Sequence, residues 1–399
     1  MNKSGGAERY CLEMIAALMD NGFSVSLYTI DRTDWEHLEK THSLLIRSCN
    51  EFYLREKKLE PLGLLSWLNT AILYLWLLVR GCEEADICIN NYGEVMPFFA
   101  QVSVIHSVPM SSISDNSYGI PLWGLIQRIY RCLFNYMDQR YGSKTIITNS
   151  KYNMRKINEK PHRLIEIVYP PVDLPRRNTV EKSGEILTVS RIKASKELNK
   201  IAEIAAYSPR NRFNVAGKTE IGSERLIRQL RQYKNIKVIA NPRRETIIQL
   251  MNQCSLYLST QSNEAFGMAI VEAMSLGCVP LIYRDGGPCF DVFQEKEDVG
   301  LTYENTLEAS RKLQLLLRDE ELRNKLRENG GVRANFFTAT RFRERFLDVV
   351  ARLEPMEKWD NPLFTLYRSV RSLRNWARLS IQRMLRSVKS HSPVAPPAQ

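Results

Sequence analysis

Short apolar runs alternate with segments of helical period through the second half of the chain. The apolar runs lie at 185–192, 211–217, 235–241, 255–260 and 279–285. The first four are followed by segments with apolar residues three or four positions apart, at 195–207, 224–233, 245–254 and 266–277. Short Val/Ile/Leu runs between helices are typical of a parallel sheet covered on both faces. The pattern therefore predicts a doubly wound α/β domain.

The first half repeats this pattern less regularly. We expect a helix at about 8–20 and strands within 23–30, 85–91, 102–106 and 144–150. Consecutive prolines at 170 and 171 suit a crossing between domains, because proline continues neither a helix nor a strand ladder. The predicted organisation is an N-terminal domain (1–170), a C-terminal domain (171–353) and a tail (354–399). Helices within 306–353 either close the second domain or pack back on the first.

The length and composition agree with this organisation. A chain of 399 residues suits two domains, and 44% hydrophobic with 25% charged residues is typical of a globular protein. The eight cysteines form no Cys-x-x-Cys pair and no zinc-like spacing, so we interpret them as reduced thiols. The N-terminus lacks the apolar core of a secretory signal, which favours a cytoplasmic location.

Two segments raise the question of a membrane. Residues 62–79 carry no charge, a length near the lower limit for a spanning helix. A helix buried on the sheet or dipping into one leaflet is the favoured interpretation, and a true span is the alternative. The tail places Leu366, Val370 and Leu373 at steps of three and four among arginines, and no acidic residue follows Asp360. This pattern predicts a basic amphipathic helix on an anionic membrane surface, with a terminal helix docked on the first domain as the alternative.

The segment NEAFGMAIVEAMSLGCVP at 263–280 contains the sharpest chemical signal. Glu264 and Glu272 stand eight residues apart across a predicted strand-to-helix turn. The amides of Phe266, Gly267 and Met268 lie at the start of that helix, where unpaired N–H groups and the helix dipole attract a phosphate. A carboxylate suits the paired hydroxyls of a ribose, because it accepts two hydrogen bonds at once. A helix N-cap role is the alternative for Glu264, and a helix-surface acid is the alternative for Glu272.

This segment closely resembles the Glu-x7-Glu signature of the family 4 glycosyltransferases, which have the GT-B fold. The resemblance covers nearly the whole chain and includes SGGAERY (4–10), VSVIH (102–106), ITNSKYNMRK (147–156), VYPPVD (168–173), LTVSRIKASKE (187–197) and FNVAGK (213–218). Together with DGGPCFDVF (285–293), it is most similar to the mannosyltransferases of lipid-linked oligosaccharides. It implies two Rossmann-like domains that face each other across a cleft. Because relatives have a strand before the glycine loop, the first strand of the N-terminal domain is expected to be missing.

Carried onto this chain, the resemblance implies a role for each matching residue. Arg191 and Lys196 meet the family's Arg-x4-Lys spacing and would neutralise the donor diphosphate without a metal. Glu264 would contact the transferred sugar, and Glu272 would hold the ribose. Glu197 stands where the family often has glycine, so a different local turn is expected there. The stretch at 242–244, ProArgArg, is interpreted as solvated surface.

The remaining predicted site residues are a histidine and three glycines. His106 ends a strand at the edge where doubly wound domains bind ligands, and the resemblance implies that it orients the donor sugar or acceptor. Gly5 and Gly6 resemble the loop that lets the backbone approach the diphosphate. Gly217 resembles the glycine near the donor base. The alternatives are a structural histidine, an ordinary loop and a turn glycine.

The resulting hypothesis is transfer of a hexose, with mannose from GDP-mannose favoured and a UDP-sugar as the other donor, to a lipid-linked or polysaccharide acceptor at the cytoplasmic membrane face. The resemblance implies that the anomeric configuration is retained. No metal or other cofactor is expected. A sugar-nucleotide epimerase of the same fold and a non-catalytic, membrane-associated sugar-nucleotide-binding protein are the rivals. A nucleic-acid partner is not expected, because the excess positive charge lies on one amphipathic tail and no RNA- or DNA-binding motif accompanies it.

Overall fold

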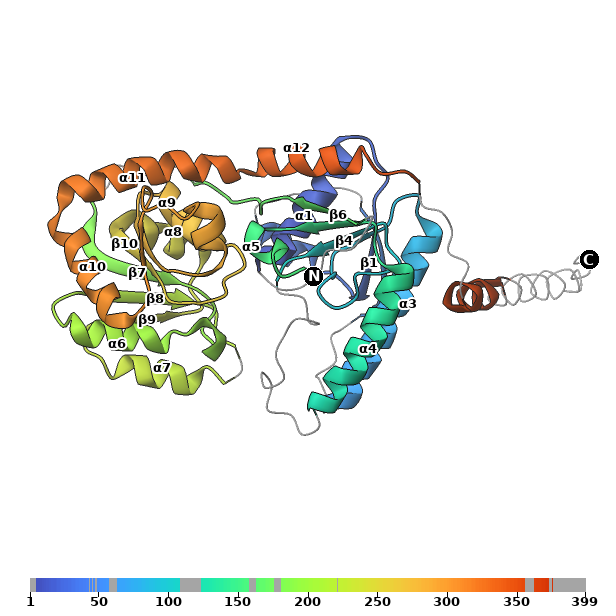
Figure 1. Ribbon diagram of the computed structural model, residues 1–399, viewed down its shortest axis with the longest axis horizontal. Coiled ribbons are helices and arrows are strands. Elements are labelled where there is room, and N and C mark those ends of the chain that lie inside the picture. The colour runs from blue at the N-terminus through green and yellow to red at the C-terminus, as the bar shows by residue number, and fades with distance from the viewer. Residues whose placement is uncertain are drawn as a thin grey trace, which may run out of the picture.

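A computed structural model describes residues 5–42, 44, 46, 49–56, 63–107, 123–157, 163–175, 181–220, 222–355, 362–372 and 375. The chain forms two α/β lobes that lie side by side, and the N-terminal segment belongs to the lobe that carries α3 and α4 (Figure 1). Sheets of two, four and six strands make up these lobes. All three sheets are parallel. The predicted α/β class with parallel sheets is confirmed.

The six-stranded sheet lies in the second lobe and has the order β12-β11-β10-β7-β8-β9. Its strands are β7 (Ser183–Val189), β8 (Phe213–Gly217), β9 (Ile236–Ala240), β10 (Cys254–Ser259), β11 (Val279–Tyr283) and β12 (Leu301–Tyr303). The helices between and after them are α6 (Asn199–Tyr207), α7 (Glu224–Arg231), α8 (Arg244–Gln253), α9 (Met268–Ser275), α10 (Thr306–Arg318) and α11 (Glu320–Ala334). The strand order reverses beside β7, which makes the carboxyl ends of β7 and β10 the expected ligand site of a doubly wound sheet.

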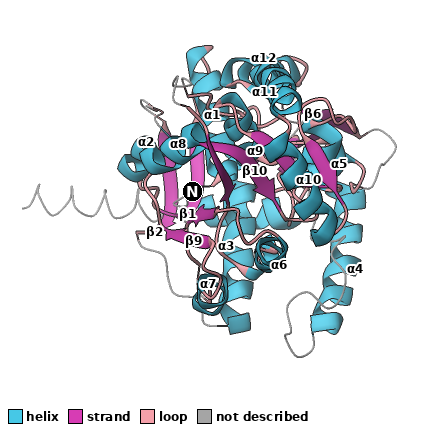
Figure 2. Ribbon diagram, turned by 90° about the vertical axis from the view of Figure 1, so that its left-hand side faces the viewer, coloured by secondary structure: helices cyan, strands magenta, loops and turns pink. Residues whose placement is uncertain are grey.

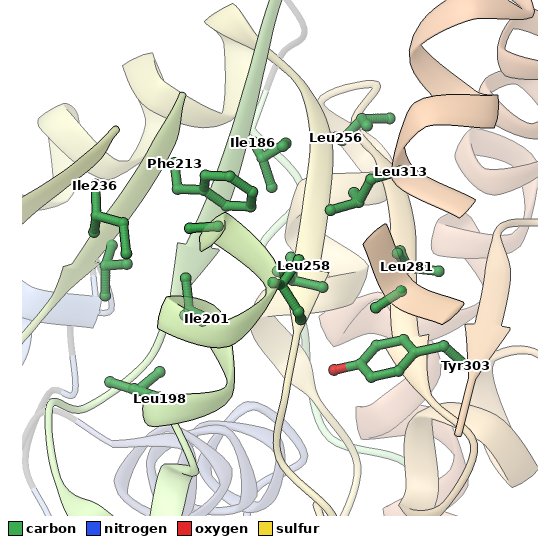
Figure 3. Close-up of a cluster of buried hydrophobic side chains, with 14 of the residues drawn as sticks. Ile186, Leu198, Ile201, Phe213, Ile236, Leu256, Leu258, Leu281, Tyr303 and Leu313 are labelled. Carbon is green, nitrogen blue, oxygen red and sulfur yellow. The ribbon is translucent and has the colours of Figure 1, made fainter. Parts of the chain in front are cut away.

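Helices cover both faces of this sheet (Figure 2). An apolar layer lies between the sheet and the helices on each face. On one face, Ile186, Phe213 and Leu258 pack against Ile201 of α6 and Leu313 of α10 (Figure 3). The opposite face carries Leu187 and Tyr257, which pack with residues of α8 and α9. Neighbouring strand residues such as Ile186 and Leu187 point to opposite faces, so both must be apolar when helices cover both sides. This explains the continuous apolar runs in the sequence.

The first lobe contains a divided sheet. β1 (Ser26–Asp31) pairs only with β2 (Asn50–Arg55) among the described strands, and the order of the other sheet is β3-β4-β5-β6. Its strands are β3 (Ile89–Asn90), β4 (Val102–Ile105), β5 (Thr145–Thr148) and β6 (Leu164–Ile167). The helices are α1 (Gly6–Asp20), α2 (Trp35–His42), α3 (Gly63–Glu84), α4 (Trp123–Tyr141) and α5 (Lys151–Met154). Residues 1–4, which precede Gly5 and α1, lie outside the described residues, so the missing first strand stays a prediction.

The last long helix of the predicted C-terminal domain packs on the first lobe. Phe342 and Phe346 of α12 (Ala339–Val350) join the same core as Tyr10 and Ile15 of α1. Figure 1 shows α12 above α1, whereas α10 and α11 cover the second lobe. Arg343 of α12 also donates to the buried Glu13 of α1 at 2.7 Å. Both alternatives for residues 306–353 are therefore realised, each by a different helix.

The apolar segment at 62–79 forms most of α3. Leu77, Leu78 and Val79 are buried, whereas Ile72 is exposed. Among the described residues, no helix has both the length and the apolar character that a membrane span requires. The side chains of residues 62–69 lie outside the described part of the chain.

The start of the tail forms a helix at 362–372 that docks on α3. Phe364 and Tyr367 are buried in a cluster with Leu78 and Phe134, and the Arg368 guanidinium pairs with Glu83 at 2.6 Å. The opposite side of this helix leaves Leu366 56% and Val370 41% exposed. The docked arm is thus realised for these residues, yet two members of the predicted apolar stripe stay at the surface. Leu373 and the stripe beyond it lie outside the described residues.

Candidate active site

The predicted cation and carboxylate of the second lobe meet at the carboxyl ends of β7 and β10. The Nζ atom of Lys196 donates to Oε2 of Glu264 at 2.7 Å. Lys196 ends a short 3₁₀ turn (Ala194–Lys196) after β7, and Glu264 lies in the loop after β10. Arg191 leaves the same strand end, but its guanidinium pairs with Glu220 at 2.9 Å and is 50% exposed. The two predicted cations therefore have different carboxylate partners.

Glu197 explains how the loop keeps its turn without the family's usual glycine. Its φ of 53° lies in the left-handed region that glycine adopts most easily. The Glu197 carboxylate accepts hydrogen bonds from Ser262 Oγ and Lys200 Nζ, both at 2.5 Å. These bonds hold the side chain and compensate for the backbone conformation. The backbone at Glu197 thus adopts a left-handed conformation, and a turn that differs from the family's stays a prediction.

The loop from Glu264 to α9 is shaped by its backbone. Gly267 has a φ of 90°, and a Cβ atom there would lie 2.9 Å from Pro288 Cγ. The amide of Gly287 donates to the Glu264 carbonyl at 2.7 Å, which ties this loop to the turn before the π-helical residues Pro288–Val292. Phe266 is buried, and its ring lies 5.1 Å from that of Phe337. The Phe266 side chain therefore anchors the loop in the core.

Glu272 lies on the second turn of α9 and is held by an arginine that sequence reasoning missed. Arg244 donates from NH1 to Oε2 of Glu272 at 2.8 Å and from NH2 to Oε1 at 2.9 Å. The interpretation of residues 242–244 as solvated surface is therefore wrong for Arg244, although Arg243 is exposed. The sequence offered no signal, because an arginine at a helix start is usually solvated.

The glycine loop of the first lobe reaches the second lobe at the start of α9. A Cβ atom on Gly6 would lie 2.7 Å from the Sδ atom of Met268, so α1 and α9 begin in contact. The Gly5 amide donates to the Glu8 carboxylate at 3.1 Å. Gly5, Gly6, Gly267 and Met268, which were all predicted to bind the donor, thus gather at two neighbouring helix starts.

Gly217 is required by the packing of two strand ends. It is the last residue of β8, and a Cβ atom there would lie 1.6 Å from the carbonyl oxygen of Ser190. The Gly217 carbonyl also accepts the Asn241 amide at 2.8 Å. This geometry gives the turn-glycine interpretation a physical basis, and it brings Gly217 within reach of the backbone just before Arg191.

His106 ends β4 with its ring against α1. The imidazole lies edge-on to Tyr10 with centroids 4.9 Å apart, and its Nε2 atom is 2.8 Å from Oδ1 of Asn91. The Asn149 side chain donates to the His106 carbonyl at 2.8 Å. Burial lowers the pKa of His106 to about 4, which keeps the ring neutral near pH 7.

A buried carboxyl group beside His106 also escaped sequence reasoning. One oxygen of Glu94 accepts the His106 amide at 3.0 Å, while the other has no hydrogen-bond partner among the described residues. Burial is the main cause that raises the pKa of Glu94 to about 7. Glu94 follows the two-residue strand β3, which is too short to give a periodic signal in the sequence.

The ITNSKYNMRK segment joins the two lobes next to the Glu264 loop. The carboxylate of Asp291 accepts the Lys151 amide at 2.7 Å and the Tyr152 amide at 3.2 Å. The Tyr152 hydroxyl donates to Oδ1 of Asn263 at 2.6 Å. These hydrogen bonds connect α5 of the first lobe with the π-helical turn and the Glu264 loop of the second.

The described residues contain no group of three or more His, Cys, Asp or Glu side chains that could hold a metal ion. All eight cysteines fall within the described residues, and no disulfide joins them.

Known proteins resemble this chain in sequence family and in fold. Residues 173–333 match the family model of the glycosyl transferases group 1. The fold matches HepE from Anabaena, solved with UDP and glucose, with a TM-score of 0.66 at 17% identity over 88% of this chain and 98% of that chain. It also matches WaaG, a glycosyltransferase of lipopolysaccharide biosynthesis, with a TM-score of 0.65 at 17% identity, covering 88% and 97%.

The relatives in sequence are mannosyltransferases. The GDP-Man:Man(3)GlcNAc(2)-PP-Dol alpha-1,2-mannosyltransferase of Dictyostelium discoideum is 22% identical over 65% of this chain. The match spans only 60% of that relative's length. The human alpha-1,3/1,6-mannosyltransferase is 21% identical over 71% of this chain and 78% of its own length. The chain therefore has the GT-B fold, matches the glycosyl transferases group 1 over residues 173–333, and resembles the mannosyltransferases of lipid-linked oligosaccharides.

Proposed function

We propose that this protein is a retaining glycosyltransferase of family 4 that transfers mannose from GDP-mannose to a lipid-linked or polysaccharide acceptor. The observation that carries the proposal is the pairing of Lys196 with Glu264 at the strand ends where this fold binds its ligand. The relatives named above, two mannosyltransferases, support mannose as the transferred sugar. The UDP in the HepE complex makes a UDP-sugar the competing donor.

In this mechanism the second lobe binds the donor. The amides at the start of α9 and the Lys196 ammonium hold the diphosphate, and Arg191 reaches the same group after it leaves Glu220. The hydrogen bond from Lys196 to Glu264 holds that carboxylate directed at the hydroxyls of the sugar. Glu272 accepts hydrogen bonds from the ribose hydroxyls. The cations stabilise the negative charge of the leaving diphosphate, so the proposal needs no metal ion.

The first lobe binds the acceptor and orients the reacting centre. The neutral imidazole of His106 lies between α1 and the end of β4, on the side where α1 meets α9. The bond between the anomeric carbon and the diphosphate breaks as the acceptor oxygen attacks from the same face. The acceptor proton passes to an oxygen of the leaving phosphate. Configuration is thereby retained, and no enzymatic nucleophile takes part.

The helix at 362–372 supports a peripheral position at the cytoplasmic membrane face. Phe364 and Tyr367 are used for docking on α3, so Leu366 and Val370 remain exposed on the other side. Arg371 lies on the docked side, 4.0 Å from the Glu84 carboxylate of α3. Exposed apolar residues on one side of a helix suit insertion at the boundary between headgroups and acyl chains. A lipid-linked acceptor would be presented at the same surface.

Calorimetric titration with GDP and with UDP in EDTA tests the donor site. We expect one nucleotide to bind without added metal and Lys196→Ala or Arg191→Ala to weaken it about 10-fold or more. Arg210→Ala is the matched control, because this exposed arginine precedes β8 and lies at the opposite end of the sheet. Binding of neither nucleotide by the folded protein would refute the proposal.

Product analysis tests the reaction. GDP-mannose with a lipid-linked oligosaccharide extract should give an extended lipid, and the donor alone should stay unchanged. Conversion of the donor sugar into an epimer without acceptor would establish the rival epimerase instead.

A further inference from the structure

The geometry around Glu272 points to Arg244 as a residue of the donor site. We propose that Arg244 is a positioning residue that fixes the Glu272 carboxylate for the two hydroxyls of the donor ribose. The inference rests on the proposed function, in which Glu272 holds that ribose. It assigns a role to a side chain that no motif in the sequence singles out.

The first step of the argument is the two-pronged contact. Arg244 bonds both oxygens of Glu272, at 2.8 and 2.9 Å, through two different guanidinium nitrogens. Such fork-to-fork pairing fixes the plane of a carboxylate as well as its position. Each carboxylate oxygen accepts about two hydrogen bonds. One acceptor direction on each oxygen therefore remains for the 2′- and 3′-hydroxyls of a ribose.

The second step is the burial of the pair. The Glu272 side chain is only 12% exposed and that of Arg244 is 32% exposed. Removing one partner of a buried ion pair leaves the other charge uncompensated, which is costly. Arg244 is therefore needed to hold the Glu272 carboxylate at this position.

The third step is the continuation of the charges into the first lobe. The Arg244 NH2 atom lies 3.8 Å from Oδ2 of Asp173, and the Arg9 NH1 atom lies 3.8 Å from the same oxygen. Asp173 follows the proline pair between the lobes, and Arg9 belongs to α1, which begins at the glycine loop. The chain of alternating charges thus runs from Glu272 through Arg244 and Asp173 to Arg9 of α1. The Glu272 carboxylate is thereby positioned relative to both lobes.

The test compares the affinities for GDP and 2′-deoxy-GDP, with UDP and 2′-deoxy-UDP as the parallel pair. We expect the wild-type protein to prefer the ribonucleotide about 10-fold, the effect of one charge-assisted hydrogen bond. Arg244→Gln should lose most of this preference, and Arg244→Lys should keep part of it. The matched control Arg243→Gln removes the same charge from the neighbouring, exposed residue and should leave the preference intact.

A double variant separates positioning from simple destabilisation. Glu272→Gln should abolish the ribose preference, and adding Arg244→Gln should then change it no further, because both residues act on one contact. The double variant also avoids leaving a buried carboxylate without a partner. Retention of the wild-type preference in Arg244→Gln would overturn the role of Arg244 alone. Failure of the wild-type protein to bind any of the four nucleotides would overturn the proposed function, and this inference with it.

Discussion

Lys196 and Glu264 form a direct ion pair with 2.7 Å between Nζ and Oε2, although 68 residues separate them in the chain. Their side chains are largely buried, at 15% and 23% exposure. The pair links the loop after β7 to the loop after β10, which are neighbouring strands of the sheet. The cation proposed for the leaving diphosphate and the carboxylate proposed for the sugar therefore act as one unit.

This unit makes the effects of the two residues non-additive. Lys196→Ala and Glu264→Gln should each lower kcat by about 10²–10³, since each removes a charge aimed at the reacting centre. The double variant should be little worse than either single one. Steady-state kinetics with GDP-mannose would check this, and fully multiplied losses would show that the two residues act independently.

Glu94 predicts an unusual dependence of stability on pH. Burial raises its pKa from the ordinary 4.5 to about 7, so the folded state binds this proton more tightly than the unfolded chain does. The contribution of Glu94 is fully present below pH 4.5 and is lost as the pH rises toward 7. Glu94→Gln should gain stability relative to wild type across this window. Urea unfolding at several pH values measures the difference, and Glu36→Gln, at an exposed position, is the control.

His42 and His106 act in the opposite direction. The pKa values of His42 and His106 fall from 6.5 to about 4, mainly because burial disfavours the charged ring. Their contribution to stability is present above pH 6.5 and is lost as the pH falls toward 4. His42→Gln should therefore lose less stability than wild type between these pH values. Equal losses in the two proteins would show that His42 is accessible to protons in the folded state.

Gly267 combines a left-handed backbone with a crowded position. Gly267→Ala should destabilise the protein by about 1–3 kcal/mol and weaken donor binding, because the φ of 90° and the contact with Pro288 both oppose a Cβ atom. Gly331→Ala in α11 is the matched control, since no atom lies within 4 Å of its Cβ. The control should gain up to about 1 kcal/mol from helix propensity. Thermal unfolding compares the two variants.

Substitutions on the two faces of the helix at 362–372 should have different effects, one on membrane binding and the other on stability. Leu366→Ser with Val370→Ser should reduce sedimentation with anionic vesicles and leave the unfolding midpoint unchanged, because both side chains are exposed. Phe364→Ala should instead destabilise the protein by about 3–5 kcal/mol, as expected for a fully buried aromatic residue. Undiminished vesicle binding by the double serine variant would place the membrane contact elsewhere.

The sequence by itself determined the class of the second lobe and the neighbourhood of its site. The strand runs at 185–192 and 255–260 are apolar on both faces. This pattern predicts a sheet that helices cover on both sides, because both faces must then be buried. Glu264 and Glu272 stand on one short strand-to-helix turn, so their proximity to the start of α9 follows from local geometry. The glycine loop at Gly5 and Gly6 was predicted from the resemblance, and its role in donor binding stays a prediction.

The tertiary structure alone decided which charges meet. Arg244 precedes Glu272 by 28 residues, and only the packing of α8 beside α9 brings them together. The position of Glu94 follows from a strand of only two residues. The contacts of Asp291 are made between the two lobes. The helix α12 packs on the first lobe, although it follows the second in the sequence. An arginine or a glutamate has the same sequence signature whether it is solvated or paired, because its partner is chosen by the fold. Periodicity records which face of an element is buried, and it contains no information about which distant charge lies opposite.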